Sequence, residues 1–209
     1  MSFYYTYIIS YLIFSLYCYY IDVLSNPNKV ESEKNKEKYS LSIHLVVFNV
    51  CFVTCIAFNI IEYIYEPRPF YITTSFRDLI ICKYSSEILF YGVHRLFHTI
   101  RFLQKLHKVH HEFSHPIGIR AAYAHPIDYF FGNLIPIGIS PFILNTDKYT
   151  ILFMVVYGVY TTIVKEHSSY KQGTDHHIKH HRYYNCNYGA RWLDKLCKTY
   201  RTNETNRIN

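Results

Sequence analysis

The stretch LSIHLVVFNVCFVTCIAFNIIEYIY, residues 41–65, contains one acidic residue and no lysine or arginine. A helix of about 20 mostly apolar residues crosses the hydrocarbon core of a bilayer, so this stretch is long enough to span a membrane. The apolar run at 2–24 lacks a basic amino-terminal region and a small-residue cleavage site, which favours a retained membrane helix over a signal peptide. The sequence therefore predicts an integral membrane protein.

Three more segments are predicted to be helices. Residues 78–98 form a more amphipathic helix that ends in histidines. Residues 128–144 and 149–164 are apolar and are joined by the sequence NTDK, which is typical of a turn. They are expected to form a helical hairpin that enters or crosses the bilayer.

The basic residues are distributed unevenly along the chain. If the helix at 78–98 crosses the membrane and the hairpin goes out and back, residues 25–40, 94–127 and 165–209 share one face. That face holds 18 of the 22 lysine and arginine residues, and the positive-inside rule makes it cytosolic. A membrane-side surface explains the net charge of +7, and nucleic-acid binding is not expected because a soluble basic domain would not carry several apolar runs.

The same face carries three clusters of histidines. On a helix, positions i, i+3 and i+4 lie on one side, so each cluster can direct two or three imidazoles toward one point. Neutral imidazole binds iron, zinc, copper and nickel well. Because one tetrahedral metal needs about four ligands, these eight histidines suggest two metals. The clusters are His94 and His98; His107, His110 and His111; and His177, His180 and His181.

Other histidines lie beside these clusters. His167 follows the hairpin and returns to the same surface, so we expect it to be a ninth ligand. His125 precedes a proline, where a histidine either binds metal or caps a helix. His176 lies about 100° around a helix from His177 and is expected to support the ligands. His125, His176 and Asn187 are candidates for an additional ligand or a neighbour of the site.

Taken together, these motifs resemble the fatty acid hydroxylase and sterol desaturase superfamily of membrane di-iron enzymes. The sequences GVHRLFH, AAYAHPID and EHSSY are similar to the family patterns YWxHRxxH, AxxYAHPxE and HSGY. The sequence HHRYYNCNYG resembles the HHxxFNxNYG ending of sterol C-4 methyl oxidases and cholesterol 25-hydroxylase. The resemblance covers roughly residues 78–199.

The resemblance implies two non-haem irons as cofactors, with O2 as the oxidant. It also implies a separate electron-transfer protein, either cytochrome b5 or an NAD(P)H-dependent reductase. The expected reaction is hydroxylation or desaturation of a C–H bond in a sterol or fatty acyl chain dissolved in the bilayer, and the iron carries it because no side chain is a strong enough oxidant. No catalytic residue is expected beyond the metal ligands, which would be His94, His98, His107, His110, His111, His167, His177, His180 and His181.

The expected fold class is all-α, an integral membrane helical bundle with a cytosolic, histidine-rich helical cap that holds a dimetal site. The expected location is a multi-pass position in a membrane of the endoplasmic reticulum type. The predicted parts are transmembrane helices and a charged linker at 1–77, the catalytic domain at 78–199, and a polar tail at 200–209.

The sequence departs from the family pattern at three places. The family usually ends in WDxxFGT, whereas Trp192 to Thr199 has another spacing and no Gly-Thr pair; Ser169 replaces a glycine, and Asp128 replaces a glutamate. These changes leave open how the carboxy-terminal helix packs over the metals. An inactive family member is therefore one alternative. The other alternative is a membrane zinc-binding or transport protein.

Overall fold

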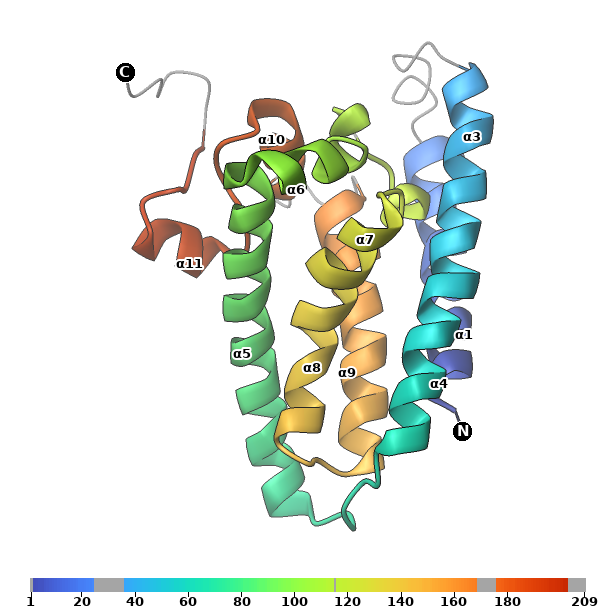
Figure 1. The fold of residues 1–209 in the computed structure, drawn as a ribbon, viewed down its shortest axis with the longest axis vertical. Helices are drawn as coiled ribbons and strands as arrows, with labels where there is room; N and C mark the ends of the chain where they lie inside the picture. Colours follow the sequence, from blue (N-terminus) through green and yellow to red (C-terminus); the bar gives the residue numbers. More distant parts are fainter. Residues whose placement is uncertain (1, 25–35, 115, 169–175, 203–209) are drawn as a thin grey trace.

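A computed structural model describes residues 2–24, 36–114, 116–168 and 176–202 (Figure 1). Within these residues the chain is helical and forms no β-strand, apart from one isolated bridge between Arg68 and Asp147. The predicted all-α class is therefore confirmed. Most of the predicted linker, Ser169 and most of the predicted tail lie outside the described residues.

The amino-terminal part of the chain forms two long helical rods. The second rod contains Ser42–Ile64, which among the described helices is the one long and apolar enough to cross a membrane. It coincides with the span predicted at 41–65, and the other spans stay predictions. The elements are α1 (Phe3–Tyr19), the π-helical segment η1 (Tyr20–Leu24), α3 (Lys36–Val47), the π-helical segment η2 (Phe48–Val53) and α4 (Thr54–Ile64).

The helix predicted at 78–98 is longer than expected. Helix α5 runs from Ile72 to Thr99, which corresponds to about 42 Å at 1.5 Å per residue. The predicted range begins at Asp78, a charged residue. Instead, Asp78 is buried inside the helix and its carboxylate is paired with Arg68 and Arg77. A buried carboxylate that is satisfied in this way does not end the helix.

The predicted hairpin is present. Asp147 caps the second arm, because its Oδ1 accepts hydrogen bonds from the backbone N–H groups of Tyr149 and Thr150 at 2.9 and 3.0 Å. Asn145 occupies the turn with φ of 48°, a left-handed conformation that asparagine tolerates well. The arms consist of α7 (Pro126–Asp128), η5 (Tyr129–Leu134) and α8 (Ile135–Ile143), followed by α9 (Lys148–Tyr160) and η6 (Thr161–His167).

Figure 1 shows α4, α5, α8 and α9 side by side along the long axis of the molecule, with α6 and α10 lying across one end and α11 beside α5. Buried side chains from α1, α4, α9 and η6 form one continuous core. The end covered by α6 and α10 is where every histidine cluster lies. The elements there are α6 (Arg101–His107), η3 (His110–Glu112), η4 (Gly118–Arg120), α10 (His176–Tyr183) and α11 (Arg191–Leu196).

Candidate metal centre

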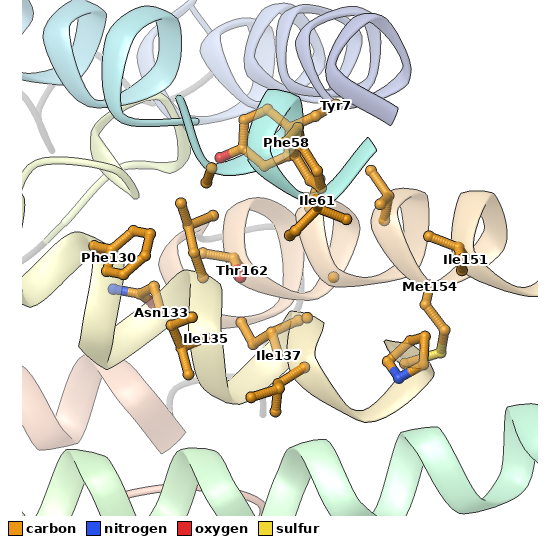
Figure 2. Close-up of a pocket in the computed structure, with 18 of the residues that line it drawn as sticks. Tyr7, Phe58, Ile61, Phe130, Asn133, Ile135, Ile137, Ile151, Met154 and Thr162 are labelled. Atoms are coloured by element: carbon orange, nitrogen blue, oxygen red, sulfur yellow. The ribbon is translucent and has the colours of Figure 1, made fainter. Parts of the chain in front are cut away.

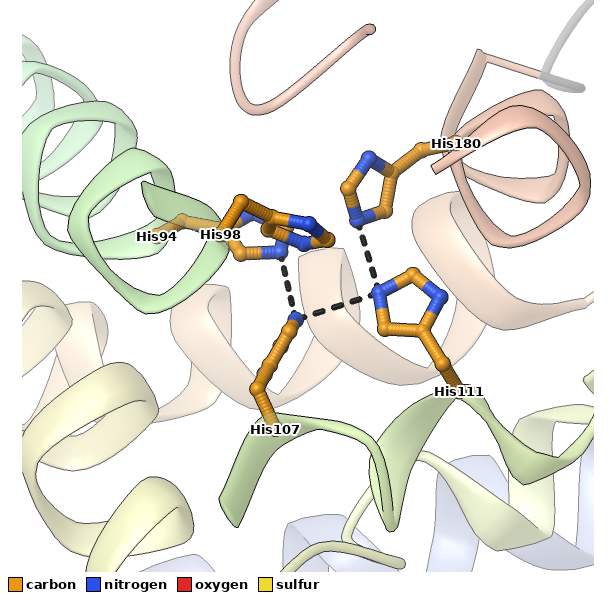
Figure 3. A group of neighbouring side chains, drawn as sticks. All are labelled: His94, His98, His107, His111 and His180. Carbon is orange, nitrogen blue, oxygen red and sulfur yellow. Dashed lines mark hydrogen bonds between the residues drawn. The ribbon is translucent and has the colours of Figure 1, made fainter. Parts of the chain in front are cut away.

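Nine histidines converge at this end of the bundle in two groups. Within each group, one nitrogen from every histidine lies within 4.8 Å of the others. The structure thus brings together all nine residues that the resemblance implied as ligands. The first group is His94, His98, His107, His111 and His180 (Figure 3), and the second is His110, His167, His177 and His181.

Neighbouring histidines in the sequence are divided between the two groups. His110 and His111 are adjacent on η3, yet His110 joins the second group and His111 the first. His180 and His181 on α10 are divided in the same way. Successive helical residues point about 100° apart, so a pair of adjacent histidines can serve two centres that lie side by side. The HxxHH pattern therefore builds both groups at once.

Hydrogen bonds on the outer side of the rings fix their orientation. A backbone carbonyl oxygen can only accept, so the Nδ1 that faces it carries the proton and the Nε2 is left as a bare lone pair. His107 is held in the same way by a carboxylate, because its Nδ1 lies 2.8 Å from Oδ2 of Asp128. The carbonyl pairs are His94 with Tyr188 at 2.6 Å, His110 with Tyr123 at 2.9 Å, His167 with Thr162 at 2.6 Å, His180 with Cys186 at 2.7 Å and His181 with Phe113 at 3.1 Å.

The bare nitrogens face one another. The Nε2 atoms of His94 and His107 are 3.0 Å apart, and those of His110 and His167 are 3.5 Å apart (Figure 3 shows the first pair). Neither atom of such a pair has a hydrogen to donate, so the contact is repulsive unless a cation sits beside both lone pairs. Both nitrogens of His98 and the Nε2 atoms of His177 and His181 are also buried with no hydrogen-bond partner among the described residues. The donor set therefore fits metal ions that prefer neutral nitrogen ligands.

Burial keeps these rings neutral. Desolvation lowers the pKa of His167 to about 3, and it also lowers the pKa of His110 below the ordinary value of 6.5. Burial, together with the neighbouring His110 and His98, lowers the pKa of His111 as well. Neutral imidazole is the form that binds metal, so the fold keeps the rings competent for ligation at neutral pH.

The three further candidates from the sequence belong to neither group. His125 caps α7, where its Nδ1 accepts from the N–H of Ile127 at 3.2 Å. His176 donates from Nε2 to Asp194 at 2.9 Å. Asn187 donates from Nδ2 to the backbone carbonyl oxygens of His176 at 3.2 Å and Arg201 at 3.1 Å. The structure thus places all three in the surrounding framework.

Asp194 is a residue whose importance the sequence did not reveal. Its buried carboxylate accepts from the backbone N–H of Tyr188 at 2.8 Å and from the hydroxyl of Thr199 at 2.7 Å, in addition to His176. Burial alone would raise the pKa of Asp194, but the hydrogen bonds from His176 and Thr199 hold it below the usual value. Because the carbonyl of Tyr188 orients His94, Asp194 fixes the loop on which that orientation depends.

The altered carboxy-terminal motif keeps its hydrogen bonds. The N–H of Thr199 donates to the carbonyl of Asp194 at 2.8 Å, and this turn requires Lys198 to adopt φ of 58°. That is the left-handed region in which glycine is favoured, and the family pattern has a glycine next to the threonine. The departure in sequence therefore leaves the turn in place with a strained lysine.

Two more residues at the site went unrecognised in the sequence. Asp128 stood out only as a replacement for glutamate, and its contact with His107 depends on tertiary structure. Tyr184 has φ of 69°, and its ring centroid lies 4.3 Å from that of His111 and 5.1 Å from that of His98. A bulky residue held in this region is strained, and such strain is common beside functional sites.

One cavity is lined by several of the histidines, and a second, apolar cavity shares part of its wall. A cavity of about 160 Å³ lies between α5, η5 and η6, and its lining includes His94, His107, His110, His167 and His177. A second cavity of about 410 Å³ lies among α1, α4, α8 and α9, and its lining is almost entirely aliphatic and aromatic (Figure 2). The larger volume falls in the range of pockets that enclose a small organic ligand.

Residues 79–199 match the family model described as fatty acid hydroxylase. Fatty acid hydroxylase domain-containing protein 2 of Homo sapiens is 28% identical over an alignment of 192 residues, and this alignment covers 81% of this chain and 57% of that protein. Fatty acid hydroxylase ahd1 of Mycosarcoma maydis is 32% identical over an alignment of 181 residues, which covers 79% of this chain and 46% of the relative. Methylsterol monooxygenase 1 of Rattus norvegicus is 33% identical over an alignment of 157 residues, which covers 68% of this chain and 52% of the relative.

The chain spans about half the length of these curated relatives. No solved structure matches it. The match with the family model covers more than half of the chain and includes all nine of the converging histidines. The chain therefore belongs to the fatty acid hydroxylase family.

Proposed function

We propose that this chain is a membrane-bound, di-iron, O2-dependent oxidoreductase that hydroxylates or desaturates a C–H bond of a sterol or fatty acyl chain. The observation that carries the proposal is the pair of histidine groups with bare inner nitrogens, because it fits two metal ions. The apolar cavity nearby supports a lipid substrate. The family and its relatives, which include a methylsterol monooxygenase, support oxidation as the reaction.

In this proposal, each histidine group holds one iron. When bound, the irons supply the oxidising power that an unactivated C–H bond requires and that side chains lack. The protein contributes orientation, because the outer carbonyls and Asp128 hold the imidazoles in one tautomer. It also contributes an apolar cavity that would shield the hydrocarbon part of the substrate from water. Electrons would come from a separate protein, cytochrome b5 or an NAD(P)H-dependent reductase.

We also propose a multi-pass arrangement in a membrane of the endoplasmic reticulum type. In addition to Ser42–Ile64, the rods containing α1 and α5 and the hairpin of α8 and α9 would cross the bilayer, with the histidine end facing the cytosol. Large apolar side chains on these helices are exposed, among them Leu16, Ile143 and Phe153, and a lipid surrounding would cover them. The predominance of basic residues near the histidine end supports this orientation.

The test combines metal analysis with lipid profiling. The double variant His110→Ala and His111→Ala removes one histidine from each group. The matched control is His44→Ala, since His44 is exposed on α3 and belongs to neither group. We expect about two irons per wild-type chain, and an oxidised lipid that disappears in the double variant but persists in the control.

Stable zinc with no uptake of iron would contradict the proposal and favour a zinc-binding protein. Iron binding with a lipid profile that is identical in wild type and double variant, when both are stably produced, would point to an inactive member of the family.

A further inference from the structure

The metal-side cavity and the apolar cavity share part of their lining. Four residues border both cavities, so they form the partition between them: Asn133, Ile137, Gly158 and Thr162. In Figure 2, Asn133 and Ile137 project from the η5–α8 segment, and Thr162 from the segment that follows α9. Ile137 lines both cavities, so a lipid that occupies both would pass beside its side chain.

Gly158 leaves the space into which Ile137 projects. A Cβ atom at position 158 would lie 2.8 Å from Cγ2 of Ile137, closer than carbon atoms approach. Isoleucine is branched at Cβ, so its χ1 rotates between distinct staggered positions, each of which moves a methyl group. The bare backbone of Gly158 gives that movement room. A methyl group at 158 would take this room away.

The two cavities differ in chemistry. The metal-side cavity carries the histidines together with Glu87, Lys165 and Glu166, whereas the far part of the apolar cavity is lined by residues such as Phe58 and Ile61 of α4. An amphiphile fits this arrangement in one direction, with its polar head beside the charged residues and its hydrocarbon end in the apolar cavity. Each methylene that leaves water for such a cavity favours binding by about fourfold.

We infer that Ile137 and Gly158 form a gate between the two cavities, and that this gate selects lipids with a flexible alkyl or acyl chain. The hydrocarbon end passes Ile137 into the apolar cavity, and a carbon nearer the head stays beside the histidines. A flexible chain can pass one displaced side chain, whereas a rigid fused ring system needs a wider opening. The inference rests on the proposed function, because it assigns the substrate class of that site.

Photo-crosslinking of the purified full chain in lipid nanodiscs tests the gate. The probe is a long-chain fatty alcohol that carries a diazirine on its terminal carbon, and labelled peptides are identified by mass spectrometry. In the wild type we expect labelling of α4 at Phe58 and Ile61. Gly158→Ala should lower that labelling about tenfold, the equivalent of about 1.4 kcal/mol, while Ile137→Ala should raise it. Gly92→Ala is the matched control, because a Cβ there meets no atom within 4 Å and Gly92 lines neither cavity.

The two gate variants act in opposite directions, so a folding defect in one of them does not remove the test. Equal labelling of α4 in wild type, Gly158→Ala and Ile137→Ala would overturn the gate. Labelling of α4 by a probe with its diazirine next to the alcohol carbon would overturn the direction of binding. Labelling needs neither iron nor turnover, so the expected pattern in a protein that takes up no iron would count against the proposed function alone.

Discussion

Replacing Asp128 is expected to weaken one of the two metal positions and leave the other. Its carboxylate accepts from Nδ1 of His107 at 2.8 Å, and the two side chains are 2% and 5% exposed. The Nε2 of His107 lies 3.0 Å from that of His94 and 3.1 Å from that of His111, so His107 occupies the middle of the first group. Without Asp128 this ring loses both its orientation and the charge that increases its basicity.

The size of the effect follows from what each substitution removes. Loss of a partner on the outer side of a metal-binding histidine costs about 10–100-fold in metal affinity. Asp128→Ala removes the acceptor altogether and should lower the metal affinity about 100-fold, which corresponds to about 2.7 kcal/mol. Asp128→Asn keeps an acceptor but loses the charge, and a charge-assisted hydrogen bond is about twice as strong as a neutral one. The asparagine variant should therefore lose only about tenfold.

The assay is chelator competition on iron-loaded protein, with the iron remaining per chain as the readout. We expect Asp128→Ala to release iron in two steps, the first at about 100-fold lower chelator concentration than in the wild type. Asp78→Asn is the matched control, since Asp78 is a buried carboxylate on α5 that is paired with arginines and belongs to neither histidine group. Release of both irons together, or wild-type retention of iron by Asp128→Ala, would show that Asp128 does not support one metal position selectively.

Three further predictions concern stability. Lys198→Gly should raise the free energy of unfolding by up to about 1 kcal/mol. The exposed lysine gives up a left-handed conformation that costs about 1–2 kcal/mol, but the greater freedom of glycine in the unfolded chain offsets part of this gain. A lower melting temperature would contradict this prediction. Asp194→Ala should lower the free energy of unfolding by about 3–5 kcal/mol in denaturant titrations, because buried donors lose their acceptor. A loss below about 1 kcal/mol would show that the hydrogen bonds to Asp194 are dispensable for stability. Burial lowers the pKa of His110, His111 and His167, so below about pH 6.5 the folded metal-free protein binds fewer protons than the unfolded chain, and its free energy of unfolding should fall as the pH decreases. Titrations that give the same value at about pH 7 and pH 5 would contradict this.

The helices and the approach of the histidine clusters could be predicted from the sequence because both depend on local periodicity. Apolar runs gave the rod at 41–65 and the hairpin, and the i, i+3, i+4 spacing placed imidazoles on one side of a helix. The start of α5 could not be predicted in this way. It depends on Arg68, which precedes α5 in the chain and forms an ion pair with Asp78. This pair compensates a buried charge that otherwise indicates the end of a helix.

The division of the histidines into two groups also lay beyond local reasoning. The first group draws on α5, α6, η3 and α10, so its membership depends on how these four elements pack. The angle between His176 and His177 on a helix was sufficient to separate their roles, because it is a property of one element. The altered sequence from Trp192 to Thr199 left open how the carboxy-terminal helix packs, and the structure keeps the turn there with Lys198 in an unfavourable conformation.

Anomalous diffraction at the iron absorption edge, on crystals of the iron-loaded chain, would locate the bound metal ions. We expect two iron peaks, one among His94, His98, His107, His111 and His180 and the other among His110, His167, His177 and His181. A single peak, an iron held outside these groups, or sites that scatter only at the zinc edge would contradict this expectation.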